Sequence, residues 1–194
     1  MPRLVGPFLA PGSMSARPQP VLRVDDRFAL RPWTVEDIPA LVAAYADRDI
    51  QHWNLSSFDE AEAAEVIVKW NNQWMLETGA SWAIARTSDD FAIGRIGLRV
   101  MNLASGVAEI SYWVAPRARG VGAAPLATAA ISTWLLGDLG LHRLELGHSV
   151  HNPASCRVAI KAGYPPEGTM KSALLHLDGW HDMHWHARVD HVVA

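Results

Sequence analysis

Cysteine is almost absent from this chain: Cys156 is the only one among 194 residues. A single cysteine cannot form an internal disulfide, which excludes small secreted domains held together by disulfides and favours a reducing compartment. Long apolar runs are also missing, and none reaches the roughly 20 residues that a membrane-spanning helix needs. We therefore expect a cytoplasmic protein with no membrane partner.

Charge is scarce as well. Charged residues make up 19% of the chain, and the formal net charge is -3 at pH 7. Because nucleic-acid binding normally requires a basic surface, we expect no nucleic-acid partner. Hydrophobic residues account for 49%, which is ordinary for a compact domain, and the length suffices for one domain with its own core.

Proline is concentrated at the start of the chain, where Pro7 and Pro11 interrupt the first apolar stretch. This interruption argues against a secretion signal. We expect residues 1–20 to be a Pro-rich flexible tail and residues 21–194 to form a single domain. Met14 leaves open a second start position.

Apolar spacing and turn residues predict a mixed α/β fold, with a central sheet of six to seven strands and helices on both faces. The segment 46–58 is expected to be an irregular loop. The tryptophans, nine in all, are expected mainly to fill the core. The expected strands are 28–31, 81–86, 91–100, 107–114, 144–150, 169–177 and 180–189, and the expected helices are 36–45, 59–79, 118–136 and 152–162.

A glycine-bearing turn, RARGVGA at 117–123, joins strand 107–114 to the following helix. The first amides of a helix have no internal acceptor, and the helix dipole adds partial positive charge there. Gly120 and Gly122 would let a phosphate approach the backbone closely. Taken alone, the pattern also fits a simple tight turn. It is not a Walker loop, because no Gly-Lys-Ser/Thr follows.

Taken together, the motifs resemble the GCN5-related N-acetyltransferase (GNAT) superfamily. The turn at 117–122 is similar to its acyl-CoA pyrophosphate loop, and Asn152-x-x-Ser155 with the following KAGY at 161–164 is similar to its later helix and strand. The resemblance extends over about residues 21 to 190 and is closest to the RimJ/RimL-like branch. The further segments that carry it are LRP at 30–32, AEISYW at 108–113, GYPPEG at 163–168 and the hairpin 178–189.

The resemblance implies a GNAT fold and an N-acetyltransferase. Such an enzyme transfers an acetyl group from acetyl-CoA to a primary amine, either a protein N-terminus or a small molecule, by direct attack. Another acyl-CoA donor such as succinyl-CoA, or a CoA-binding regulatory module without turnover, remains an alternative. Members of this branch often pair, so a homodimer is expected.

The resemblance also assigns cofactor contacts. The backbone at Trp113 and Val114 should hold the pantetheine arm and the thioester carbonyl, and Asn152 should bond to the pantetheine. The remaining residues expected to bind the cofactor are Arg117, Arg119, Gly120, Val121, Gly122, Ala123, Ala124 and Ser155.

Two residues are implied in catalysis. Glu109 lies where many members place a general base, which the reaction needs because most amines are protonated at neutral pH. An ion pair with Arg95 or Arg99 is the alternative role. Many members carry a tyrosine seven residues after the asparagine as general acid, but this chain has Ala159 there. Ser155 matches the serine that the RimJ/RimL-like branch uses instead, unless it only helps to start its helix.

The acceptor site is expected around His52, Trp53 and Asn54, with Trp74 as a further wall. Histidines crowd the last hairpin, at 176, 181, 184 and 186, so a zinc site is conceivable. No cysteine joins them in the sequence and the resemblance implies no metal. We therefore expect no metal cofactor.

Overall fold

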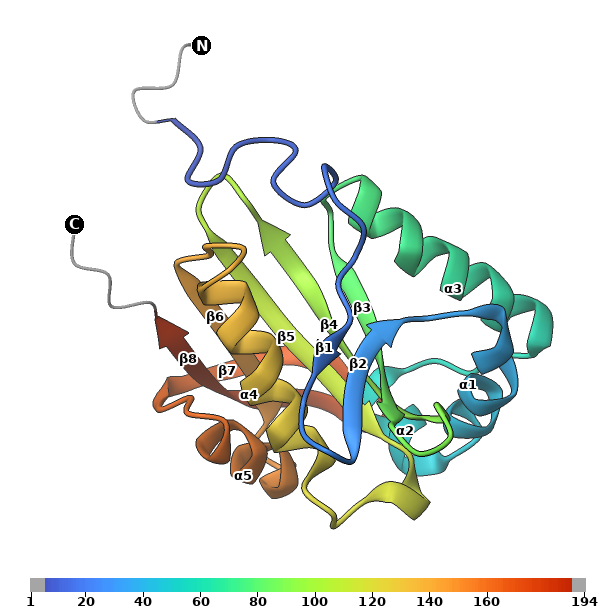
Figure 1. Cartoon of the computed structure of the whole chain (residues 1–194). Helices are drawn as coiled ribbons and strands as arrows, with labels where there is room; N and C mark the ends of the chain where they lie inside the picture. Colours follow the sequence, from blue (N-terminus) through green and yellow to red (C-terminus); the bar gives the residue numbers. More distant parts are fainter. Residues whose placement is uncertain (1–5, 190–194) are drawn as a thin grey trace.

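The computed structural model describes residues 6–189, which form an eight-stranded sheet with helices on both faces (Figure 1). The strand order is β1-β2-β3-β4-β5-β6-β8-β7, and among these described strands only β5 and β6 pair in parallel. The sheet has one strand more than predicted, because β1 is too short to leave an alternating pattern. The strands are β1 (Leu22–Arg23), β2 (Phe28–Pro32), β3 (Ala80–Arg86), β4 (Ala92–Asn102), β5 (Val107–Val114), β6 (Arg143–Ser149), β7 (Pro166–His176) and β8 (Gly179–Val189).

One face of the sheet carries a 3-10 turn (Val35–Asp37), α1 (Ile38–Tyr45), α2 (Arg48–Asn54) and α3 (Glu60–Met75). The other face carries a second 3-10 turn (Pro116–Ala118), α4 (Ala123–Leu136) and α5 (Pro153–Lys161). The prediction of an irregular loop at 46–58 was wrong for its centre. There the Asp47 carboxylate accepts from the Ile50 N–H and caps α2.

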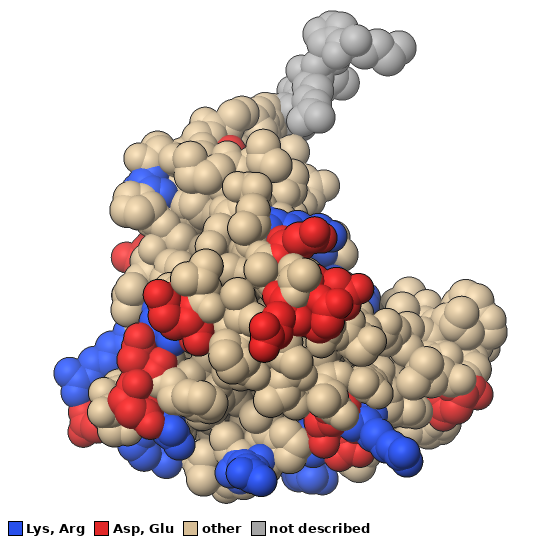
Figure 2. Space-filling view, turned by 90° about the vertical axis from the view of Figure 1, so that its right-hand side faces the viewer, with Lys and Arg blue, Asp and Glu red and all other residues tan. Residues whose placement is uncertain are grey.

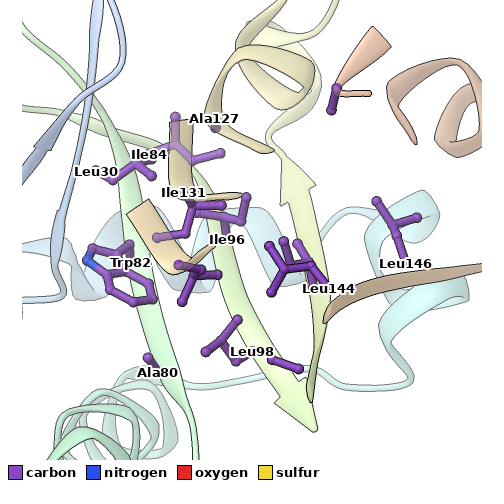
Figure 3. Close-up of a cluster of buried hydrophobic side chains, with 14 of the residues drawn as sticks. Leu30, Ala80, Trp82, Ile84, Ile96, Leu98, Ala127, Ile131, Leu144 and Leu146 are labelled. Atoms are coloured by element: carbon purple, nitrogen blue, oxygen red, sulfur yellow. The ribbon is translucent and has the colours of Figure 1, made fainter. Parts of the chain in front are cut away.

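Alternating apolar residues build a core on each face. Figure 3 shows Trp82 and Ile84 of β3 and Ile96 of β4 beside Ile131 of α4. Ala83, which lies between Trp82 and Ile84 on β3, points to the opposite face, where the second cluster contains Trp33, Trp70 and Trp113. Full burial of one such side chain stabilises the fold by about 1.5–3 kcal/mol.

The N-terminal segment contacts the domain from Phe8 onward, whereas the sequence predicted a flexible tail. Met14 is fully buried. Core tryptophans need acceptors for their indole N–H groups, and the segment supplies them: Trp74 donates to the Arg17 carbonyl and Trp82 to the Pro20 carbonyl, each at 2.9 Å. Residues 1–5 of the expected tail lie outside the described residues.

The sheet opens between its two parallel strands. β5 and β6 pair only at residues 107–109 and 143–145, while β6 pairs with β8 along its whole length. The edge of β5 from Ile110 to Val114 therefore has no partner on the β6 side. Unpaired strand amides and carbonyls at such an edge are available to a ligand.

Charged side chains of both signs are interspersed with uncharged surface on the face seen in Figure 2. The basic side chains on that face are separated from one another and form no continuous patch. Within residues 6–189, no helix combines the length and apolar character needed to cross a membrane.

Candidate functional site

A cavity of about 660 Å³ lies at the opening between β5 and β6. Its walls come from the end of β5 (residues 112–114), the loop and helix start at 118–125, α2 and α5. This volume is in the range of ordinary small-molecule sites. Of the residues predicted to bind the cofactor, Arg117 and Val121 do not line the cavity. Those that line it are Trp113, Val114, Arg119, Gly120, Gly122, Ala123, Ala124, Asn152 and Ser155.

The glycine turn presents unpaired amides to this cavity. Gly120 and Gly122 have φ of 81° and 84°, a region that favours glycine. No side chain caps α4, and the N–H groups from Gly120 to Ala124 have no acceptor among residues 6–189. A run of free amides at the positive end of a 14-residue helix suits a phosphate group.

The basic side chains around the cavity are not only those that the sequence analysis selected, which were Arg117 and Arg119. Arg119 donates to Asp49 at 2.9 Å and Asp47 at 3.2 Å, so its charge is used to tie the loop to α2. Arg157 and Lys161 of α5 line the cavity and have no ion-pair partner within the described part of the chain. Sequence analysis did not select them, although their four-residue spacing places both on one helix face.

Tyr112, Asn152 and Ser155 line both this cavity and a second one. Asn152 Oδ1 accepts from the Ser155 N–H at 3.0 Å and caps α5, which leaves the Asn152 amide nitrogen free of that role. Ser155 Oγ lies 2.7 Å from the Tyr112 hydroxyl. Burial raises the pKa of Tyr112 to about 12, so the phenol is protonated at neutral pH. Sequence analysis did not select Tyr112. Alternation along β5 places its side chain on the face opposite to that of Glu109.

The second cavity, of about 290 Å³, adjoins the first through these three residues and through Trp53 and Asn54. Among the residues predicted to contact the acceptor, Trp53 and Asn54 therefore line both cavities. His52 lines neither, but its ring stacks near that of His176, with centroids 6.2 Å apart. Trp74 instead lies in the core, tilted against Trp134 and edge-on to Trp82.

Glu109 lines the second cavity and is 7% exposed. Arg99 binds both of its carboxylate oxygens, at 3.2 Å from Nε and 3.0 Å from Nη2. The ion pair that the sequence left open is therefore present, with Arg99 and not Arg95. Burial raises the pKa of Glu109 above its ordinary value, although the Arg99 charge acts in the opposite direction.

Two histidines also line the second cavity. His176 is buried, and neither ring nitrogen has a hydrogen-bond partner within the described residues. Burial lowers its pKa, and the nearby His181 lowers it further, so the ring is neutral at pH 7. His148 is buried as well, and its Nε2 lies 3.1 Å from Nε2 of His186.

One group of side chains has the composition of a metal site. The ligand atoms of His148, Cys156 and His184 lie within 4.8 Å of one another. They come from β6, α5 and β8, so their juxtaposition could not be read from the sequence, which suggested that no cysteine joins the histidines. The absence of a metal cofactor stays a prediction.

Comparisons with known proteins identify the family of this chain. The profile of the acetyltransferase (GNAT) domain matches residues 27–165. The uncharacterized N-acetyltransferase YoaA of Bacillus subtilis is 27% identical over 154 residues, which are 78% of this chain and 86% of YoaA.

Two solved structures share the fold. RimL, a ribosomal L7/L12 alpha-N-protein acetyltransferase in complex with coenzyme A, has a TM-score of 0.80 at 20% identity, covering 88% of this chain and 98% of its own. RimJ of Mycobacterium smegmatis, in complex with CoA-disulfide, has a TM-score of 0.77 at 24% identity, covering 88% and 86%. From the domain match and the fold, the chain belongs to the GNAT family of acyl-CoA-dependent acetyltransferases.

Proposed function

We propose that the protein transfers an acetyl group from acetyl-CoA to a primary amine by direct attack. The observation that carries this proposal is the meeting of the two cavities at Tyr112, Asn152 and Ser155. One cavity offers free amides to an anionic cofactor, and the other holds groups that can accept a proton. A thioester at the junction would be exposed to both.

The cofactor would bind with its pyrophosphate on the amides from Gly120 to Ala124. Arg157 and Lys161 would add positive charge near the 3′-phosphate on the ribose of CoA. The pantetheine arm would follow the free edge of β5 at Trp113 and Val114, where backbone groups can pair with its amides. The free side-chain nitrogen of Asn152 would donate to a pantetheine carbonyl.

The chemistry follows from this placement. The amine nitrogen attacks the thioester carbon, and a β5 amide near Trp113 donates to the oxygen as negative charge develops on it. When the carbon–sulfur bond breaks, the departing thiolate takes a proton from Ser155 Oγ, and Tyr112 returns one to Ser155 across 2.7 Å. The base releases the amine proton to solvent, and solvent restores the proton of the Tyr112 phenol. The thiol pKa lies near 8.5, so a weak acid suffices. The amine proton goes to a base in the second cavity, for which Glu109 and His176 are the candidates.

The acceptor class is a primary amine, on a protein N-terminus or a small molecule. The fold shared with RimL favours the former, because RimL is an alpha-N-protein acetyltransferase. Succinyl-CoA as donor and a regulatory module without turnover remain the rivals. The module would require a cavity without a base, whereas a carboxylate and two imidazoles line this one. A cytoplasmic location stays a prediction.

The proposal is tested by incubating the protein with acetyl-CoA or succinyl-CoA and a panel of peptide and small-molecule amines. We expect acetyl-CoA to release free thiol with at least one amine, together with a mass gain of one acetyl group on that amine. Binding of acetyl-CoA without thiol release across peptides and small molecules would favour the regulatory module.

We also propose a homodimer. The edge strand β7 and the hairpin turn expose apolar side chains, including Met170, Leu175, Leu177 and Trp180, which is 64% exposed. Apolar surface of this kind at a sheet edge is commonly covered by a partner. Light scattering at micromolar concentration should give twice the 21.3 kDa of one chain. A mass of one chain would contradict the dimer.

A further inference from the structure

Arg95, on β4, carries the one formal charge in the second cavity that no described residue balances. The other arginine there, Arg99, is paired with Glu109. Arg95 Nε donates to Ser81 Oγ at 2.8 Å and Nη1 to Ser111 Oγ at 3.3 Å, and both acceptors are neutral. No carboxylate within residues 6–189 forms an ion pair with it.

Small residues surround the guanidinium of Arg95 on the sheet. Ser81, Gly97 and Ser111 lie opposite one another on β3, β4 and β5. A Cβ atom at Gly97 would come within 2.8 Å of Nη2 and 3.2 Å of Cζ of Arg95, so the group lies directly over the glycine. On its other side, Cζ is 4.6 Å from the centroid of the Trp70 ring.

These contacts orient the guanidinium plane and leave Nη2 without an acceptor among residues 6–189. A guanidinium has five N–H donors in a rigid fork, and the two serines occupy only two of them. The remaining donors can bind both oxygens of one carboxylate, which is the most favourable arrangement for an arginine.

Burial of this charge is unfavourable for the fold on its own. Desolvation lowers the pKa of Arg95, which indicates that the two serines and the Trp70 ring do not fully offset the loss of water around the charge. An apolar side chain of similar length would fill the space between Trp70 and the sheet without that penalty. A charge kept at a cavity wall under these conditions is suited to an opposite charge that arrives with a ligand.

We propose that Arg95 binds a carboxylate of the acceptor, so that the preferred acceptors are amines carrying an acidic group close to the reacting nitrogen. This inference rests on the proposed transferase function and narrows its acceptor class. The carboxylate can belong to a free amino acid, or to an acidic side chain next to a peptide N-terminus.

The test measures binding without turnover, so its failure is distinct from a failure of the transferase proposal. Wild-type protein saturated with CoA is titrated by calorimetry with matched pairs of acetylated products. N-acetylglycine against N-acetylglycinamide represents the free amino acid. N-acetylserylaspartic acid alpha-amide, whose side-chain carboxylate is free, against N-acetylserylasparagine amide represents the peptide. In at least one pair, the acid should bind about tenfold or more tighter than the amide, as expected for a charged hydrogen-bonded pair.

Variants test whether Arg95 causes the preference for the acid probe over the amide probe. In Arg95→Met the preference for the acid should disappear, and Arg95→Lys should keep part of it, because a point charge remains without the fork. Lys69→Gln, which removes an exposed positive charge next to Trp70, should keep the full preference. Equal affinity for acid and amide in both pairs, or no binding of any probe, would overturn the proposal. So would an unchanged preference in Arg95→Met. If that variant does not fold, the wild-type comparison decides alone.

Discussion

In the Gly122→Val variant, acetyl-CoA is expected to lose its stabilising effect on the fold. At a ligand concentration of 100 times Kd, binding should stabilise the wild-type protein by about 2.7 kcal/mol. For a chain of this length the melting temperature should then rise by roughly 5–11 °C. A β-branched side chain at φ of 84° distorts the turn, and its Cβ stands where the pyrophosphate would meet the amides. We therefore expect a shift near zero.

The matched control is Gly163→Val. Gly163 ends α5 with φ of 83°, no atom lies within 4 Å of a Cβ built there, and it lines neither cavity. The same backbone strain should lower the melting temperature of both variants without ligand. Only the ligand-induced rise separates them, and it should persist in the control. A full rise in Gly122→Val would remove the pyrophosphate from this turn.

Much of the fold was predictable because its signals are local. The hairpin at Asp178-Gly179, the helix capped by Asn152 and the strand 107–114 follow from turn residues and alternation. α2 was missed because its seven residues, with Trp53 and His52 among them, give no apolar period. The packing of the N-terminal segment was missed because it depends on indole N–H groups of distant residues.

The site was predictable only where one motif holds all its parts. The amides from Gly120 to Ala124 belong to one turn, so a single motif and its family resemblance were enough to select them, although the turn alone also fitted a simple tight turn. The residues that contact the Arg95 guanidinium come from three strands and a helix. Nothing in the sequence spacing of Ser81, Gly97 and Ser111 shows that they lie side by side. The same holds for the contact of Tyr112 with Ser155, 43 positions apart.

Glu109→Gln is expected to lower the acylation rate of a high-pKa amine by about 10²–10⁴-fold at neutral pH. The change keeps the shape of the side chain and removes its charge. Acetyl-CoA affinity should stay close to that of the wild type, because Glu109 lines only the second cavity. The rate should recover partly as pH rises and free amine becomes abundant, which a pH series of thiol release would measure.

The comparison variant is His176→Asn, because both side chains line the same cavity. Glu109 acts as a base only when ionised, so with its pKa raised the wild-type rate should fall as pH drops through a value above the ordinary 4.5. His176 acts only when neutral, and its lowered pKa places its own acid limb below 6.5. Because a pKa raised above 4.5 and a pKa lowered below 6.5 can overlap, the wild-type pH–rate profile alone does not identify the base, and the variants must.

The ion pair with Arg99 makes the opposite outcome informative. If Glu109 serves only that pair, Glu109→Gln should lower the melting temperature, since Arg99 loses the partner that holds it, while turnover and the pH–rate profile stay near those of the wild type. A large loss confined to His176→Asn would then assign the proton to the imidazole whose two nitrogens have no partner among residues 6–189. The thioester site at Tyr112 and Ser155 would be unchanged, because neither side chain forms part of the Glu109–Arg99 pair.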